Sequence, residues 1–382
     1  MPSEDAPFLF LSANTPWVYT LAERLAEDAA VHVVQFYDWR TYWTHEPTWP
    51  TDDPDAGIRR TLRVLPTGYA GRLEWLARPF MRWMIDGWRD DLRERGGGEP
   101  YVVVPYPYLA PWVRGVPDDR LVYYNLDAYT LYRPERAGRI RGQEAELVER
   151  ATRTICLSQH QAQAIQDRHP NRADRIEHFP LGVVEDFVNP SPERDREPGT
   201  VGYVGNLGDR VDWGLVDEVV RQCSGLEFLF AGGLNGGGTL DGDGWREERA
   251  RALDRTNVMH LGRIPQREVT EVYWRSAVNW IPYDPTHPFN EASCPTKVMD
   301  GIASGRPVVS TSVPECTLYP QWITVADEPD ELAENLRRQA KRPSSHSPRQ
   351  QIQFARGHTW EHRAQTLRRL LGVQIETEVH RR

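Results

Sequence analysis

The stretch from Phe289 to Ser310 contains residue types that could hold both a phosphate and a sugar hydroxyl. Its sequence, FNEASCPTKVMDGIASGRPVVS, predicts a loop, a helix opened by Cys294-Pro295, a turn at Gly305 and a buried strand. The first backbone N–H groups of a helix lack partners within the helix, so its start is a site for an anion. Lys297 and Asp300 fall in the first turns of this helix, where we expect them to bind phosphate and a ribose hydroxyl.

The lysine at position 297 is unusual for this chain. Lysine and arginine together number 46, yet only Lys297 and Lys341 are lysines. A lysine ammonium is a compact point charge, whereas arginine presents a planar fork of donors. The departure from arginine at 297 therefore supports a specific role for an ammonium group there.

Strands and helices alternate along the chain in two series, which predicts an α/β fold of two doubly wound, Rossmann-like domains. In the first series we expect strands at 8–12, 31–36, 101–104, 120–127, 153–157 and 176–179, and helices at 21–28, 143–151 and 159–168. In the second we expect strands at 200–204, 227–231, 258–261, 278–282 and 323–326, and helices at 212–223, 266–276, 331–341 and 359–371. Segment 180–198 has the composition of a linker. We expect an N-terminal domain at 1–185, a C-terminal domain at 186–350, and a helix and tail at 351–382.

Polar residues follow several of the predicted strands, at the edge where open α/β sheets bind ligands. Ser12 and Asn14 follow the first strand, and they either face a substrate or cap the next helix. Asp127 ends another strand and is therefore expected at the same edge.

Two aromatic segments stand outside this alternation. Residues 37–55 combine Trp and Tyr with an acidic end and are predicted to form a long surface loop. Residues 73–95 are predicted to form a helix in which Trp, Phe and Met alternate with arginines. Such a helix either lies on an anionic membrane surface or packs on the core with a solvated, charged face.

Composition limits the classes of function. A chain of 382 residues with 39% hydrophobic residues is typical of a globular protein of two domains. No apolar run approaches the roughly 20 residues that span a bilayer, and the N-terminal residues lack the pattern of a signal peptide. The four cysteines lack paired spacing, which predicts reduced thiols in a cytoplasmic protein. A formal charge of −9 argues against nucleic acid as the main partner.

The glycine-rich segment from Gly202 to Gly208 follows a predicted strand, as a dinucleotide-binding motif would. However, Glu227 begins the next strand, whereas the ribose-binding acid of that motif ends it, and no helix follows the third glycine directly. We therefore interpret the segment as a turn that lets backbone and Arg210 approach a phosphate.

Two other motifs could hold a metal. Asp241-Gly-Asp243 resembles the metal-binding acid pair of a large class of glycosyltransferases that have a single nucleotide-binding domain. The surrounding glycines instead favour a flexible loop. His358-Thr-Trp-Glu-His362 matches the inverted zinc-protease pattern, whose third ligand lies far downstream, beyond where this sequence ends. We therefore predict no metal site and interpret Trp360 as an apolar anchor of the last helix.

Several short motifs, in the right order, resemble the nucleotide-sugar half of GT-B glycosyltransferases. The resemblance is greatest to the group that contains the teichuronic acid glycosyltransferase and other bacterial exopolysaccharide enzymes. The motifs are Gly202-Tyr-Val-Gly-Asn-Leu with Asp-Arg-Val-Asp212, Asn257-Val-Met-His-Leu-Gly-Arg-Ile-Pro265, Ile281-Pro-Tyr-Asp284, Pro295-Thr-Lys297 with Asp300, and Gly305-Arg-Pro-Val-Val309. Residues 121–182, with Tyr123-Tyr-Asn-Leu-Asp127 and Ser158, are similar too, so the likeness spans most of the chain but is weak before residue 100.

This resemblance implies two Rossmann-like domains that face a cleft and a C-terminal helix that crosses back. It implies a nucleotide-sugar donor, usually a UDP-sugar, on the C-terminal domain, an acceptor on the N-terminal domain, and no metal or other cofactor. Asp300 corresponds to the ribose-binding acid, Lys297 and Arg210 to diphosphate ligands, and the turn from Arg263 to Pro265 to the base-contacting loop. The other donor-site residues that it implies are Gly205, Asn206, Tyr283, Asn290, Ser293 and Thr296.

The acid pair of retaining members of the broad family is incomplete here. In that pair two glutamates are separated by seven residues; Asp300 stands at the second position, whereas the first is Ala292, with Glu291 beside it. A related GT-B group, which includes the xanthan glucuronosyltransferase, has a lysine before this acid and inverts configuration with an N-terminal-domain aspartate as base. Asp127 is the counterpart of that base. The alternative is that Asp127 only caps the following turn.

Together these features predict a cytoplasmic glycosyltransferase that extends a glycan or lipid-linked glycan of the cell surface. Its 73–95 helix offers a peripheral contact with the inner face of the membrane. A nucleotide-sugar epimerase or hydrolase of the same fold is one alternative. Ala292 favours another, a noncatalytic partner in glycan assembly that has kept the fold.

Overall fold

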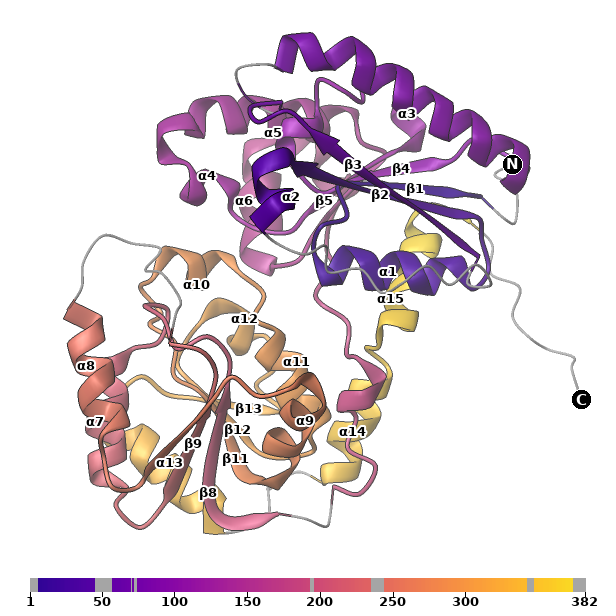
Figure 1. The fold of residues 1–382 in the computed structure, drawn as a ribbon. Helices are drawn as coiled ribbons and strands as arrows, with labels where there is room; N and C mark the ends of the chain where they lie inside the picture. The colour runs from indigo at the N-terminus through magenta and orange to yellow at the C-terminus, as the bar shows by residue number, and fades with distance from the viewer. Residues whose placement is uncertain are drawn as a thin grey trace, which may run out of the picture. The chain divides into compact units, whose positions relative to one another are not determined.

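The computed structural model describes residues 6–44, 57–69, 71, 74–192, 196–234, 244–341 and 347–373. The chain forms two compact units (Figure 1). The first comprises Met1–Pro180 together with Trp360–Arg382, and the second comprises Leu181–Thr359. The end of the chain thus returns to the first unit, where helix α15 (Trp360–Leu370) packs against helix α1 (Pro16–Ala26).

The first unit is built on a parallel sheet whose described strands lie in the order β3-β2-β1-β4-β5-β6-β7. Every pairing between neighbouring strands is parallel. The strands are β1 (Phe8–Leu11), β2 (Val31–Asp38), β3 (Ile58–Leu65), β4 (Tyr101–Val104), β5 (Leu121–Asn125), β6 (Arg153–Cys156) and β7 (Ile176–His178). The helices besides α1 and α15 are α2 (Trp39–Thr44), α3 (Glu74–Gly96), α4 (Tyr129–Tyr132), α5 (Ala137–Arg150) and α6 (Gln159–Arg168).

The second unit has a parallel sheet whose described strands lie in the order β10-β9-β8-β11-β12-β13. The strands are β8 (Glu197–Val204), β9 (Glu227–Ala231), β10 (Val258–Gly262), β11 (Ser276–Ile281), β12 (Val308–Ser310) and β13 (Ile323–Val325). The helices are α7 (Trp213–Gln222), α8 (Gly244–Leu253), α9 (Gln266–Arg275), α10 (Pro288–Ala292), α11 (Thr296–Ala303), α12 (Pro314–Thr317), α13 (Pro329–Lys341) and α14 (Pro348–Arg356). Helices α7 and α13 pack together, as do α11 and α14.

The central strands of both sheets are buried on both faces, as the continuous apolar runs predict. All four residues of β1 and all four of β4 are buried, and so is every residue of β11. The predicted α/β class with two doubly wound units is therefore confirmed.

Several predicted boundaries in the first unit were wrong. Helix α1 begins at Pro16 rather than at residue 21, with proline in its first turn, where its missing N–H costs nothing. The predicted loop at 37–55 contains the end of β2 and helix α2, while its residues 45–55 lie outside the described part. Strand β3 was not predicted because Arg59, Arg60 and Arg63 interrupt the apolar pattern of this edge strand.

Some predictions for the second unit were also wrong. Helices α8 and α14 were not predicted. In α8 charged residues dominate, and only Ala252 is buried. The predicted linker at 180–198 is partly packed, since Phe187 is buried and the side chain of buried Asn189 donates a hydrogen bond to the Ser304 carbonyl. Strand β8 already begins at Glu197.

Among the described helices, none has both the length and the apolarity that crossing a membrane requires.

Candidate functional site

The predicted anion site lies at the N-terminus of helix α11 in the second unit. Pro295 is the residue that precedes the helix rather than its first residue. Gly305 follows the helix end with a φ of 68°, a left-handed backbone that favours glycine. Buried strand β12 follows at once. The loop, helix, turn and strand predicted for this stretch are thus present.

Lys297 lies against the turn that follows strand β8. Its Nζ is 5.4 Å from the ring centroid of Tyr203 and 5.2 Å from that of Tyr283. A Cβ placed on Gly205 would come within 2.4 Å of both Cε and Nζ of Lys297. The absence of a side chain on Gly205 therefore leaves space for the lysine side chain. Its ammonium group lies against the buried rings of Tyr203 and Tyr283.

Arg210 is held by the segment that precedes α11. Its Nε donates to Oδ1 of Asn290 over 2.7 Å, and one terminal nitrogen donates to Oγ of Ser293 over 2.5 Å. The guanidinium carbon lies 5.3 Å from the centroid of the Tyr283 ring. Asn290, which is fully buried, donates in turn to the carbonyls of Arg210 and Asp284. The structure thus brings Arg210 and Lys297 to the same tyrosine ring.

The electrostatics of this cluster favour an anion. Burial raises the pKa of Tyr283, but the charges of Lys297 and Arg210 oppose this and leave it below its ordinary value. Tyr203 lies next to it, and burial raises its pKa. Two cations therefore lie beside these two phenols at the start of α11. The helix dipole makes the electrostatic potential there more positive still.

Asp300 lies one turn into α11 and is partly buried. Burial raises its pKa to about 7, while the charge of Lys297 and a hydrogen bond with Thr296 lower it. A carboxyl group poised near neutral pH can either accept or donate a hydrogen bond to a hydroxyl. Both of these predicted residues, Asp300 and Thr296, therefore belong to the same local cluster as Lys297.

Arg263 and Asn206 lie in the turns after β10 and β8, and within the described residues neither is hydrogen-bonded to Lys297 or Arg210. Arg263 is exposed after β10, and its side chain lies over Gly233, where an added Cβ would come 2.8 Å from its Nε. Asn206 is exposed, and its carbonyl accepts a hydrogen bond from Tyr203. Because β10, β9 and β8 are consecutive in the sheet, the turns after these strands follow one edge.

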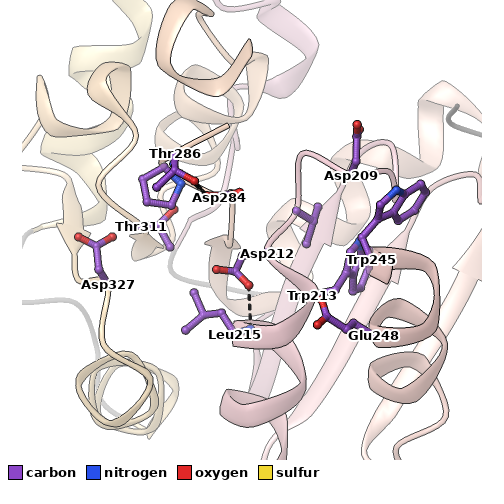
Figure 2. A pocket seen from close by; sticks show the side chains of 12 residues that line it. Asp209, Asp212, Trp213, Leu215, Trp245, Glu248, Asp284, Thr286, Thr311 and Asp327 are labelled. Atoms are coloured by element: carbon purple, nitrogen blue, oxygen red, sulfur yellow. Dashed lines mark hydrogen bonds between the residues drawn. The ribbon is translucent and has the colours of Figure 1, made fainter. Parts of the chain in front are cut away.

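A separate cavity of about 440 Å³ opens beside α7 and α8 (Figure 2). Five carboxylates line it, and most of them serve the local backbone. Asp212 accepts from the Leu215 N–H at the start of α7, Asp284 from Thr286, and Asp327 from Ser312. The other two are Asp209 and Glu248. An anion would be repelled here, so the cavity is not the phosphate site.

In the first unit Asp127 follows strand β5, as predicted. Its Oδ1 accepts from the Ala128 N–H over 2.8 Å, and its Oδ2 accepts from the Tyr132 hydroxyl over 2.5 Å. The carboxylate is partly exposed. These contacts are those of a turn cap, and they leave the choice between cap and base open.

Ser12 directly follows strand β1, with a φ of 56° that is rare for a residue other than glycine. Its hydroxyl lies 2.7 Å from that of Tyr108, and Asn14 donates to the Phe36 carbonyl. Neither side chain caps α1, because the residue before that helix is Thr15, which makes no side-chain cap. The capping interpretation of Ser12 and Asn14 was therefore wrong.

Two contributors to the cation cluster were not predicted from the sequence. Tyr203 supplies one of the two rings beneath Lys297, and its position at the end of a central strand was the available signal. His287 begins the segment that holds Arg210. Its Nδ1 accepts from the Phe289 N–H, and its Nε2 lies 3.5 Å from a carboxylate oxygen of Asp209. Nothing in the local sequence indicated that contact.

The two metal motifs have different outcomes. Asp241-Gly-Asp243 lies outside the described residues. His358 stacks on Phe354 at 4.0 Å, and its Nδ1 lies 2.7 Å from the Phe354 carbonyl oxygen. Trp360 is buried, in line with its predicted role as an anchor. Within the described residues, no group of three or more His, Cys, Asp or Glu side chains is arranged to hold a metal ion.

Two comparisons with known proteins match parts of the chain. Residues 213–369 match the family model described as "Glycosyl transferase-like". A segment of 182 residues is 24% identical to TuaH of Bacillus subtilis (strain 168), a protein assigned to teichuronic acid biosynthesis as a glycosyltransferase. This segment covers 46% of the chain and 44% of TuaH, so the match spans less than half of that relative.

Solved structures resemble the chain over nearly its whole length. Anabaena Alr3699/HepE in complex with UDP and glucose aligns with a TM-score of 0.64 and 15% identity, covering 97% of this chain and 100% of that one. Sucrose-phosphate synthase from Thermosynechococcus elongatus aligns with a TM-score of 0.65 and 16% identity over the same shares. These likenesses establish the fold. The chain therefore has the GT-B fold, and its residues 213–369 match the glycosyl transferase-like family model.

Proposed function

We propose that this protein is a glycosyltransferase that moves a sugar from a nucleotide-sugar, a UDP-sugar, to a glycan or lipid-linked glycan acceptor. The observation that carries the proposal is the convergence of Lys297 and Arg210 at the start of α11, over the ring of Tyr283. The similar HepE structure holds UDP and glucose, and TuaH is assigned to teichuronic acid biosynthesis. Both support a UDP-sugar donor and a cell-surface polysaccharide as product.

The chemistry of transfer explains why such a cluster is needed. As the bond from the anomeric carbon to the phosphate oxygen breaks, negative charge develops on the departing diphosphate. Preorganised donors and cations stabilise that charge without having to reorganise. Lys297, Arg210 and the N–H groups of α11 supply these donors. Because they can neutralise the leaving group themselves, we propose that transfer does not require a metal ion.

For the acceptor step we propose an inverting reaction with Asp127 as general base. A base must lie within hydrogen-bond reach of the acceptor hydroxyl, and the partly exposed Asp127 carboxylate follows strand β5 at the ligand-binding edge of its sheet. The position of the first retaining acid is held by Ala292, which is buried. That position can supply no carboxylate, which argues against the retaining acid pair.

We place the reaction in the cytoplasm. Cys156, Cys223 and Cys316 are buried in the two cores as thiols outside any disulfide. Thiols that remain unpaired are typical of a reducing compartment.

Titration calorimetry with UDP, GDP and ADP tests the donor site. We expect UDP to bind to the wild type and Lys297→Ala to weaken it by about 10- to 150-fold, because a hydrogen bond to a charged group is worth about 1.5–3 kcal/mol. Lys341→Ala is the matched control, since it removes the other lysine, which is exposed at the end of α13. Failure of all three nucleotides to bind to the wild type would contradict the proposal.

A noncatalytic partner in glycan assembly is the second candidate, because Ala292 removes one acid of the retaining pair. The two candidates differ in turnover. Nucleotide binding with no sugar transfer or donor hydrolysis, across a screen of donors and acceptors, would favour the noncatalytic role. NMR of the anomeric proton in any product would reveal its configuration, which decides between inversion and retention.

A further inference from the structure

Helix α3 exposes an unusual number of large apolar side chains. The exposed fractions are 67% for Trp75, 54% for Leu76, 52% for Phe80 and 71% for Trp83, and we call these four residues the tryptophan face. The rings of Phe80 and Trp83 stack at 6.0 Å with an angle of 27° between their planes. Leaving such side chains in water is unfavourable, and contiguous exposed apolar residues mark a docking surface.

The tryptophan face is not the core-facing side of the helix. Five other apolar residues of α3 face the core of the first unit: Met81, Met84, Ile85, Trp88 and Leu92. The helix is therefore already anchored by one apolar stripe, and the tryptophan face is a second one. The core-packing interpretation of this helix is therefore confirmed, while a membrane contact stays a prediction.

Arginines surround the start of α3. Glu74 in its first turn binds Arg78 of the same helix and Arg139 of α5, which joins the two helices. Arg82 donates to the Pro111 carbonyl, so no carboxylate neutralises its charge in that contact. The segment 133–141 carries Arg133, Arg136, Arg139 and Arg141, all of them exposed.

The net charge of this arginine-rich region is opposite in sign to that of the whole protein. Residues 74–83 and 133–141 together contain six arginines and two glutamates, a net charge of four positive, whereas the chain carries −9. An electropositive region next to exposed aromatic residues is complementary to a surface that is anionic and apolar at once.

We propose that the tryptophan face of α3, together with the arginines of 133–141, binds the protein to an anionic lipid bilayer. Tryptophan and phenylalanine bury their rings at the boundary of headgroups and acyl chains, and arginines are attracted to anionic headgroups. The helix would lie in the plane of the interface, since no described helix can span the bilayer. In a symmetric dimer this face would meet its own copy, so that like charges would oppose each other.

The acidic residues of α3 mark the limit of the contact. Asp86, Asp90 and Glu94 follow the tryptophan face along the outer side of the helix and are exposed. Arg89 pairs with Asp86 and Arg93 with Asp90. We therefore assign only the first half of α3 to the membrane, while its acidic second half stays in water.

This inference does not rest on the proposed function, because lipid binding is measured without donor or acceptor. The full chain is sedimented with vesicles of phosphatidylcholine alone and with vesicles of phosphatidylcholine and phosphatidylglycerol in equal amounts. We expect binding to the anionic vesicles, weakened when salt rises from about 0.1 M to about 1 M and the Debye length falls from about 10 Å to about 3 Å.

Paired variants separate the two parts of the surface. Trp75→Ser with Trp83→Ser should weaken binding to anionic vesicles at least tenfold, whereas Trp43→Ser on α2, a residue 78% exposed, should leave it unchanged. Arg133→Gln with Arg141→Gln should weaken it about 25-fold, at about fivefold for each arginine. The control is Arg267→Gln on α9, whose side chain is 85% exposed. Urea unfolding should show that all of these surface variants fold like the wild type.

Three outcomes would overturn the inference. One is the absence of vesicle binding by the wild type, and another is unchanged binding by the tryptophan pair variant. The third is a concentration-dependent dimer that binds no vesicles and dissociates in that variant, which would assign the face to a second copy of the chain.

Discussion

Replacing Gly205 by alanine tests whether the turn after β8 positions Lys297. The new Cβ would lie 2.4 Å from Cε and Nζ of Lys297 and 3.3 Å from the Tyr203 hydroxyl. The end of a lysine is flexible, so we expect the ammonium to move away while the backbone stays. The φ of 149° also disfavours alanine, which should cost about 1–3 kcal/mol of folding free energy.

The expected loss of nucleotide affinity follows from the displaced ammonium. If Lys297 holds a phosphate, losing this contact costs about 1.5–3 kcal/mol, or about 10- to 150-fold in the Kd for UDP. Titration calorimetry measures the affinity, and urea unfolding measures the stability. Gly208→Ala in the same turn is the control, because its Cβ would come no closer than 3.4 Å, to a nitrogen of the exposed Asn206.

A double-mutant cycle decides whether the effect passes through the lysine. In a Lys297→Ala background the added methyl group meets no ammonium, so Gly205→Ala should cause little further loss of UDP affinity. If the losses of the two single variants simply add, the glycine acts independently of Lys297, and the reasoning is refuted.

Three further predictions concern Asp300, Asp127 and Asn290. Burial raises the pKa of Asp300 in the folded state to about 7 from 3.8. Between these two pH values the folded state binds a proton that the unfolded state has lost. The contribution of Asp300 to the free energy of unfolding therefore falls as pH rises through that window, by at most about 4 kcal/mol. Asp300→Asn should remove this slope in urea unfolding measured at several pH values, and an identical slope would exclude Asp300 as its source. Asp127→Asn should slow sugar transfer by about a hundredfold to ten-thousandfold with unchanged UDP affinity, whereas full turnover would leave only the capping role. Asn290→Ala should lower the free energy of unfolding by about 2–4 kcal/mol and weaken UDP binding, because it removes the acceptor for Arg210 and one of the two donors to each of the Arg210 and Asp284 carbonyls; wild-type affinity would show that Arg210 needs no such support.

Local sequence was sufficient where a signal and its structural effect lie within a few residues. The apolar runs of β1 and β4 form buried strands, and Gly305 ends α11 because its left-handed backbone suits glycine. The position of Lys297 at a helix start followed in the same way. Where charged residues masked the pattern, as in β3 and α8, the elements were missed, because contacts with the rest of the unit outweigh weak local preference.

Sequence alone determined the two α/β series, a helix start at Cys294-Pro295, one residue from the observed start, and the residue types available for anion binding. Only the tertiary structure decided that Lys297 lies over the rings of Tyr203 and Tyr283, and that Arg210 is held by Asn290. The physical reason is the parallel pairing of β8 with β11, which brings the turns after two strands distant in sequence to one edge of the sheet. The raised pKa of Asp300 likewise arises from burial, a property of the packed unit rather than of the residue.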